Sequence, residues 1–162
     1  MNDSRSGGLF VAPLTIESGI ATLVEALDLF PGARIDVIGV GPERKRIASH
    51  PRMRRAAYLV VPSLSYEETP RAVVEAFAHG LPVIASRLAT LAEMVEPGRN
   101  GLLFEPGSAR DLARRLAWAE AFPEKMRQMG LCARADYEAR FVAEWGWQRL
   151  YGERRRSARA SP

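Results

Sequence analysis

Five short apolar runs, each followed by a segment with helical character, constrain the fold of this chain more than any other feature. The runs cover residues 9–12, 34–40, 58–62, 81–85 and 102–104. Between and after them lie expected helical segments at 16–30, 43–56, 70–79, 88–95 and 108–122. Strands of four to seven residues that alternate with helices form a parallel sheet with helices on both faces, so we predict an α/β fold.

Two more helical segments, 123–141 and 142–156, close the chain. A chain of 162 residues is long enough to bury one core, so we expect a single domain over residues 9–152. Residues 1–8 and 153–162 are small, polar or basic, and we expect both ends to be disordered.

The charge of the chain argues against nucleic-acid binding. The net charge is +4, but the last ten residues hold four arginines and one glutamate and account for +3 of it. The basic residues between 44 and 55 lack the interleaved aromatic residues of a nucleic-acid site. We find neither a signal peptide nor an apolar run of about 20 residues, and we therefore expect a cytoplasmic protein with no transmembrane segment. Cys132 is the only cysteine and the two histidines are isolated, so we expect no metal site.

The stretch SLSYEETPRAVVEAFAHGLPVIAS, residues 63–86, is the best candidate for a binding site. It follows an expected strand, and ligands of open α/β sheets bind beyond the carboxyl ends of the strands. Thr69 can cap the next helix and Pro70 fits its first turn. The free amides of Arg71 and Ala72 would then face the crevice and bind an anion such as a diphosphate.

Two glutamates flank this helix start. Glu67 lies in the loop and Glu75 inside the helix, and carboxylates accept hydrogen bonds from pairs of hydroxyl groups, as sugars present them. Spacing alone does not distinguish such a pair from two solvated glutamates.

The residues around this pair resemble the C-terminal, donor-binding domain of GT-B glycosyltransferases of family 4. The resemblance covers about residues 9–152 and rests on Pro62-Ser63, Glu67 with Glu75, Glu75-Ala76-Phe77-Ala78, Gly80, Pro82, Ala92-Glu93-Met94-Val95, Gly98 and Asn100-Gly101-Leu102-Leu103-Phe104. It implies a Rossmann-like sheet that forms one half of a GT-B fold. The donor would be a nucleotide-diphosphate sugar, and the transfer of the hexosyl group would be retaining and would need no metal or other cofactor.

The resemblance also implies roles for individual residues. Glu67, as the catalytic residue, would contact the donor sugar together with Glu68 and Thr69, and Glu75 would bind the ribose hydroxyls. Arg71 would lie beside the diphosphate.

Three features depart from the family. Pro13 and Ser18 stand where the family has an arginine and a lysine that neutralise the diphosphate, and Arg71 or Arg87 would have to replace them. The link 43–57 is too short for the usual helix and strand, so we expect one edge strand to be missing. The acceptor-binding half of the family is absent from this sequence.

Two hypotheses remain from the sequence. The chain is either the donor-binding domain of a glycosyltransferase, inactive without an acceptor-binding domain, or a non-catalytic relative that binds a sugar nucleotide or a protein. Trp145, Trp147, Leu150 and Tyr151 form an apolar face at the end of the chain. This face would pack on the chain's own sheet, or would bind an acceptor-domain subunit or a second copy.

Overall fold

The computed structural model describes residues 5–39, 51–66 and 70–146, with the side chains of Pro51 and of 143–146 excepted. The segments 40–50, 67–69 and 147–162 therefore lie outside the description, and with them Glu67, Glu68, Thr69, Trp147, Leu150 and Tyr151. The side chain of Trp145 lies outside it as well.

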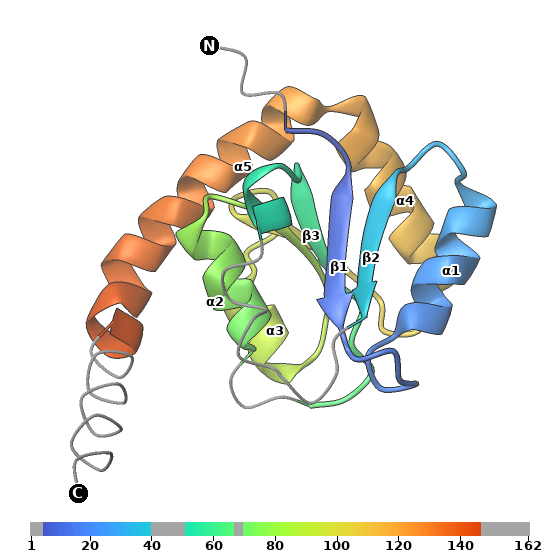
Figure 1. Ribbon diagram of the computed structural model, residues 1–162, viewed down its shortest axis with the longest axis horizontal. Helices are drawn as coiled ribbons and strands as arrows, with labels where there is room; N and C mark the ends of the chain where they lie inside the picture. The colour runs from blue at the N-terminus through green and yellow to red at the C-terminus, as the bar shows by residue number, and fades with distance from the viewer. Residues whose placement is uncertain (1–4, 40–50, 67–69, 147–162) are drawn as a thin grey trace, which may run out of the picture.

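The predicted parallel sheet is confirmed. Its strands are β1 (Gly8–Ala12), β2 (Ile35–Gly39), β3 (Tyr58–Val61), β4 (Val83–Ser86) and β5 (Gly101–Phe104). All neighbours are parallel, in the order β2-β1-β3-β4-β5. The carboxyl ends of β1 and β2 point the same way in Figure 1, and because all the strands are parallel their carboxyl ends share one edge of the sheet, the carboxyl edge.

The helices that cover the sheet are α1 (Ile20–Leu29), α2 (Arg71–Ala78), α3 (Ala89–Met94), α4 (Ala109–Ala121) and α5 (Pro123–Asp136). A short 3-10 helix, η2 (Pro51–Arg54), precedes β3, and a π-helical segment, η3 (Tyr137–Gly146), continues α5. Ser108 is the N-cap residue of α4, because its hydroxyl accepts the Asp111 N–H at 3.1 Å, and this agrees with the start expected for the helix at residue 108.

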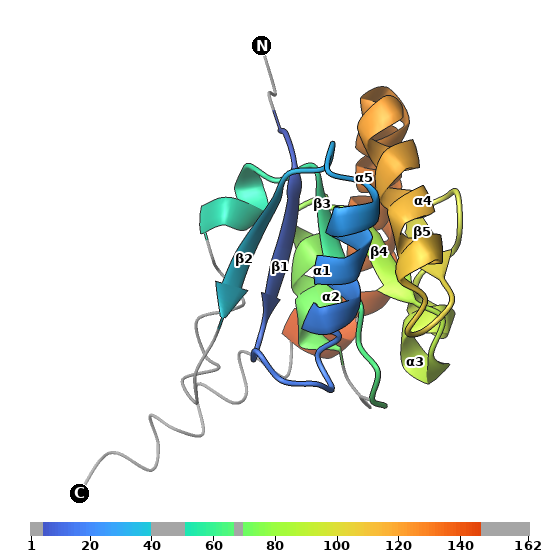
Figure 2. The same cartoon turned by 90° about the vertical axis from the view of Figure 1, so that its right-hand side faces the viewer.

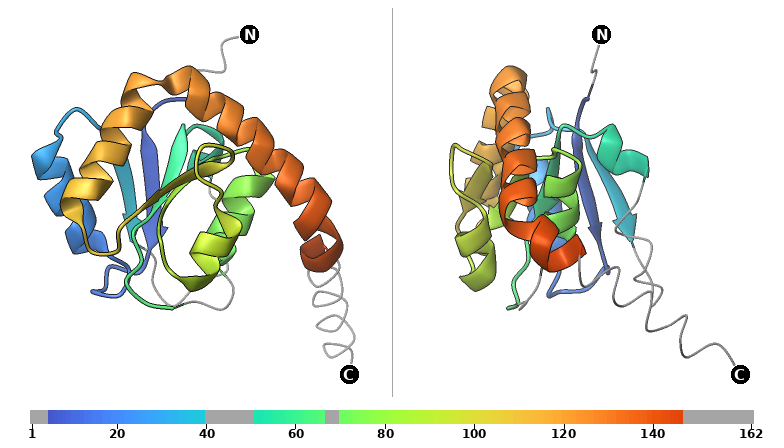
Figure 3. Two further views of the ribbon diagram at one scale, coloured as in Figure 1. Left: turned by 180° about the vertical axis from the view of Figure 1, so that it is seen from behind. Right: turned by 90° about the vertical axis from the view of Figure 1, so that its left-hand side faces the viewer.

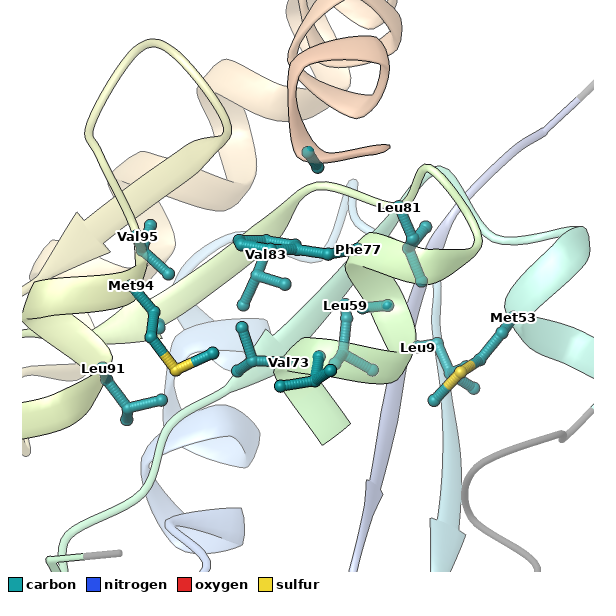
Figure 4. Packing of buried hydrophobic residues seen from close by; sticks show 14 of the residues in the cluster. Leu9, Met53, Leu59, Val73, Phe77, Leu81, Val83, Leu91, Met94 and Val95 are labelled. Atoms are coloured by element: carbon teal, nitrogen blue, oxygen red, sulfur yellow. The ribbon is translucent and has the colours of Figure 1, made fainter. Parts of the chain in front are cut away.

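Alternate residues of each strand face opposite layers of the core. Leu9, Val11 and Leu59 belong to one cluster, which packs against α2 and α3. Figure 4 shows Phe77 of α2 and Met94 of α3 in this cluster, on either side of Val83 of β4. Phe10 and Val60 point to the other cluster, which is built with α1 and α4; the two helices lie against each other on that face (Figure 2). Burial of both faces explains why β1, β3, β4 and β5 read as apolar runs, whereas β2, at the edge of the sheet, is half-buried or exposed throughout.

Helix α5 crosses the amino ends of the strands and then passes α2 (Figures 1 and 3). Its approach is close: a Cβ atom added at Gly130 would lie 2.3 Å from the carbonyl oxygen of Gly80, in the turn after α2. Arg134 of α5 donates to the Ala78 carbonyl, and Arg5 donates to the carbonyls of His79 and Gly80. Both arginines thus satisfy carbonyl groups at the C-terminal end of α2, the negative end of the helix.

The expected helix boundaries are wrong in two places. The first helix begins at Ile20 and not at Ile16, because Gly19 adopts the left-handed conformation with φ of 78°. The last two helices do not separate at Phe141, because the chain passes without interruption from α5 into η3 at Tyr137. Of the expected link 43–56, residues 51–54 form η2 and the part before residue 51 is not described.

Candidate functional site

The helices that follow β1 and β3 lie on opposite faces of the sheet. β1 is followed by α1 in one layer, and β3, its neighbour in the sheet, is followed by α2 in the other layer. Open α/β sheets bind their ligands beyond such a point, where neighbouring strands lead to helices on opposite faces, and we call this position the candidate crevice. The candidate donor-binding residues predicted from the sequence belong to these two loops and to α2.

The loop after β1 touches the loop after β3. The N–H of Leu64 donates to the Glu17 carbonyl at 2.9 Å, and the Ser63 hydroxyl lies 3.4 Å from the same oxygen. The backbone of Gly19 lies so close that a Cβ atom there would be 1.7 Å from the Pro62 carbonyl oxygen. We call this set of contacts between Glu17, Gly19, Pro62, Ser63 and Leu64 the loop clasp.

Helix α2 begins at this crevice. Its first residue is Arg71, whose side chain is exposed, and Glu75 follows one turn later and is half-buried. The sequence had placed Pro70 in the first turn of the helix, but Pro70 is the N-cap residue. Its carbonyl accepts the N–H groups of Val73 and Val74. At the far end, Nδ1 of His79 donates to the Glu75 carbonyl at 2.7 Å, so this histidine binds a carbonyl group at the end of the helix.

The two positions of the missing cations lie in the loop after β1. The Pro13 carbonyl accepts the Thr15 N–H at 2.9 Å, and the Ser18 hydroxyl donates to the Thr15 carbonyl at 2.7 Å. The Ser18 hydroxyl is therefore used within its own loop. Arg87, the other cation considered, is exposed directly after β4, and its N–H donates to the Phe104 carbonyl of β5.

Large apolar side chains are exposed on both loops of the clasp, which the sequence interpretation missed. Leu14 and Ile16 are 61% and 82% exposed, and Leu64 and Tyr66 are 42% and 66% exposed. The signal was present in the sequence, because apolar residues within loop segments cannot all belong to a core. In the part of the chain that the structure describes, no group of three or more His, Cys, Asp and Glu side chains could hold a metal ion.

The motif Gly98-Arg99-Asn100-Gly101 lies at the amino end of β5, away from the carboxyl edge, and its last residue is the first residue of that strand. The Asn100 amide donates to Asp136 at 2.8 Å and to the Met94 carbonyl at 3.1 Å, while its oxygen accepts the Glu96 N–H at 2.7 Å. The hydrogen bond from Arg99 to Asp136 lowers the pKa of that carboxyl below its usual range, against the effect of burial and with help from Asn100. These contacts give the motif a structural role.

A family model described as "Glycosyl transferases group 1" matches residues 47–120, a range that includes β3, α2, β4 and β5. The chain resembles the group 1 glycosyltransferases. An exopolysaccharide phosphotransferase from Streptomyces coelicolor is 26% identical over 85% of the chain, which covers 17% of that relative. Sucrose-phosphate synthase from Thermosynechococcus elongatus has a similar structure, with a TM-score of 0.75 and 27% identity over 99% of the chain.

The fold is also similar to that of a solved complex. Anabaena HepE, crystallised in complex with UDP and glucose, superposes with a TM-score of 0.69 and 21% identity over 86% of the chain. The Rossmann-like fold expected from the resemblance is confirmed. The chain spans less than half of each of the three proteins just named: 17% of the phosphotransferase, 47% of the synthase and 45% of HepE. Among the helices of the described residues, none is long and apolar enough to cross a membrane.

Proposed function

We propose that this chain is the donor-binding domain of a glycosyltransferase that transfers a hexosyl group from a nucleotide-diphosphate sugar with retention of configuration. The observation that carries the proposal is the start of α2 at the crevice between β1 and β3, within the range that matches group 1 glycosyltransferases. The binding of UDP and glucose by HepE, which shares the fold, is consistent with it. The proposal keeps the cytoplasmic location expected from the sequence.

The positive end of α2 and Arg71 would bind the diphosphate, because unpaired N–H groups and the helix dipole both favour an anion there. Glu75 would accept hydrogen bonds from the ribose hydroxyls. Glu67, with Glu68 and Thr69 in the segment before the helix, would contact the donor sugar, and Glu67 would be the catalytic residue. In the transfer, the bond between the anomeric carbon and the diphosphate breaks, a bond to an acceptor hydroxyl oxygen forms on the same face, and the proton of that hydroxyl passes to the departing diphosphate.

The departing diphosphate needs positive charge, and the loop after β1 provides none at residues 13 and 18. Arg71 and Arg87 are the exposed cations at the carboxyl edge that could supply part of it. We therefore place catalysis in an assembly with an acceptor-binding domain or subunit. No metal ion or other cofactor is part of the proposal.

A second candidate function is a non-catalytic module that binds a sugar nucleotide or a protein. The observation that favours it is the Ser18 hydroxyl, which is hydrogen-bonded within its own loop at a position where the family places a lysine. Such a module would retain nucleotide binding without turnover, or would lose both.

Calorimetry with UDP, GDP and ADP tests the donor site. We expect one of them to bind the wild-type chain, and Glu75→Ala to weaken that binding by about 1.5–3 kcal/mol through loss of a charged hydrogen-bond acceptor. Asp28→Ala, which removes an exposed carboxylate from α1, is the control and should leave the affinity unchanged. Equal affinity of wild type and Glu75→Ala would remove Glu75 from the site, and no binding of any nucleotide would contradict the proposed function.

A further inference from the structure

The loop clasp joins the two segments between which the donor diphosphate would lie. One is the loop after β1, which carries Pro13 and Ser18; the other leads from β3 to Arg71 and Glu75 of α2. The segments are more than forty residues apart in the sequence, so neither is placed by its neighbour along the chain. Their separation at the crevice is set by the contacts described above.

Gly19 lets the two backbones approach. It adopts φ of 78°, which L side chains rarely adopt, and any Cβ atom would overlap the Pro62 carbonyl. Its own carbonyl accepts the N–H of Leu23, the first hydrogen bond of α1. A side chain at Gly19 would therefore move both the loop after β1 and the start of α1 away from β3.

Ser63 holds the other side of the clasp. The residue is only 8% exposed, so its side chain lies below the crevice surface. Its hydroxyl is 3.1 Å from the Ser65 carbonyl oxygen and 3.4 Å from the Glu17 carbonyl oxygen, and it accepts the Ser65 N–H at 3.4 Å. The hydroxyl has one proton, which the Ser65 and Glu17 carbonyls share, so Ser63 links the loop after β3 to the loop after β1 beside the shorter hydrogen bond from Leu64 to Glu17.

We propose that Gly19 and Ser63 are positioning residues of the donor site, which fix the spacing of the two loops and through it the affinity for the nucleotide diphosphate. The inference rests on the proposed function, because it assigns the clasp a role in binding this ligand. Neither residue contacts the ligand in this proposal; both act through the backbone of the loops. Small displacements of binding groups weaken binding strongly when several groups must contact one ligand together.

Four variants, with UDP, GDP and ADP as calorimetric probes, test the proposal. Ser63→Ala should weaken nucleotide binding by about threefold to tenfold, the range of a lost hydrogen bond, and Ser63→Thr, which keeps the hydroxyl, should restore it. Gly19→Ala should weaken binding by about tenfold or more. Gly98→Ala is the matched control: Gly98 also has a left-handed backbone, with φ of 83°, but a Cβ atom there has no neighbour within 4 Å.

The control separates positioning from a general loss of stability. Gly98→Ala and Gly19→Ala both place alanine in a strained backbone conformation and should both lower the thermal midpoint, but Gly98→Ala should keep the wild-type affinity. If Gly19→Ala does not fold, the nucleotide affinities of Ser63→Ala and Ser63→Thr test the positioning role by themselves. Wild-type nucleotide affinity in Ser63→Ala would overturn the positioning role and leave the donor site standing. So would a loss of affinity in Ser63→Thr and Gly98→Ala as large as the loss in Ser63→Ala and Gly19→Ala. A wild-type chain that binds none of the three nucleotides would overturn the donor site itself, and this inference with it.

Discussion

At the scale of single residues, Asp136 connects parts of the molecule that are distant in the sequence. It is the last residue of α5, it is buried, and it accepts hydrogen bonds from Arg99 and Asn100 in the turn before β5. Asn100 in turn holds the end of α3 through the Met94 carbonyl. The motif Gly98-Arg99-Asn100-Gly101 can therefore be explained by packing at a site remote from the crevice.

The lowered pKa of Asp136 predicts a pH dependence of stability. A carboxyl whose pKa is lower in the folded than in the unfolded chain stabilises the fold above its unfolded pKa of about 3.9, and the contribution is lost as the pH falls through the folded value. Asp136→Asn should lower the free energy of unfolding at pH 7 by about 1.5–3 kcal/mol, because the charged acceptor is lost. The difference from wild type should shrink below pH 4.

Urea denaturation at pH 7 and at pH 3 measures both effects. Glu124→Gln is the control, because Glu124 also pairs with an arginine, Arg127, but at the exposed surface. Exposed pairs of this kind contribute little, so this variant should unfold almost like wild type at both pH values. The same deficit in Asp136→Asn at the two pH values would show that its carboxylate charge is not what stabilises the turn.

At the scale of elements, α2 is held at one end and open at the other. Arg5 and Arg134 bind the carbonyls at its C-terminal end, Gly130 of α5 contacts the following turn, and Phe77 lies 6.3 Å from Phe141 of η3, measured between ring centroids. The start of the helix, at Arg71, faces the crevice. The packing of α5 thus fixes the direction in which α2 presents its N-terminal end.

Gly130→Ala tests the contact between α5 and the turn after α2. Helix propensity alone predicts that alanine stabilises this interior position of α5 by about 1 kcal/mol. The Gly80 carbonyl, 2.3 Å from the added Cβ atom, predicts the opposite sign, because the backbone would have to move. We expect a net loss of stability in chemical denaturation, and a stabilised variant would show that the helix shifts without cost.

The elements could be predicted from the sequence where one local signal decided them. The buried strands read as short apolar runs, and Ser108 with Asp111 marked the start of α4. The start of α1 could not be predicted from local sequence. Gly19 has a non-helical backbone where it packs against Pro62, about forty residues away. The loop clasp was missed for the same reason. Among the candidate residues of the crevice, Arg71 and Glu75 followed from the strand–helix pattern as well as from the resemblance, whereas Pro13, Ser18 and the individual roles came from the resemblance; the structure describes Pro13, Ser18, Arg71, Glu75 and Arg87.

At the scale of the whole molecule, the proposed function makes the chain one wall of a larger site. It spans 47% of sucrose-phosphate synthase and 45% of HepE, and its exposed apolar loop residues border the crevice. An acceptor placed against this wall alone would be open to water on the other side. Pro13 and Ser18 also provide no positive charge for the departing diphosphate, which is a second reason to expect no catalysis by the chain alone.

We therefore predict that the isolated chain has no transferase activity with any common sugar nucleotide and an added acceptor. The double variant Pro13→Arg with Ser18→Lys should raise the affinity for the nucleotide by about tenfold, since each new cation can form a charged hydrogen bond with the diphosphate. It should still produce no glycoside. Product formation by the isolated wild-type chain, followed by chromatography, would show that the acceptor side is already present.

The strand order has a consequence for synthesis of the protein. β1 lies inside the sheet and pairs with β2 on one side and with β3 on the other. During translation at about 5–20 residues per second, several seconds pass between the emergence of β1 and that of β3. Throughout this interval the apolar β1 has an unsatisfied edge, and such edges on nascent chains are the ones that aggregate or require a chaperone.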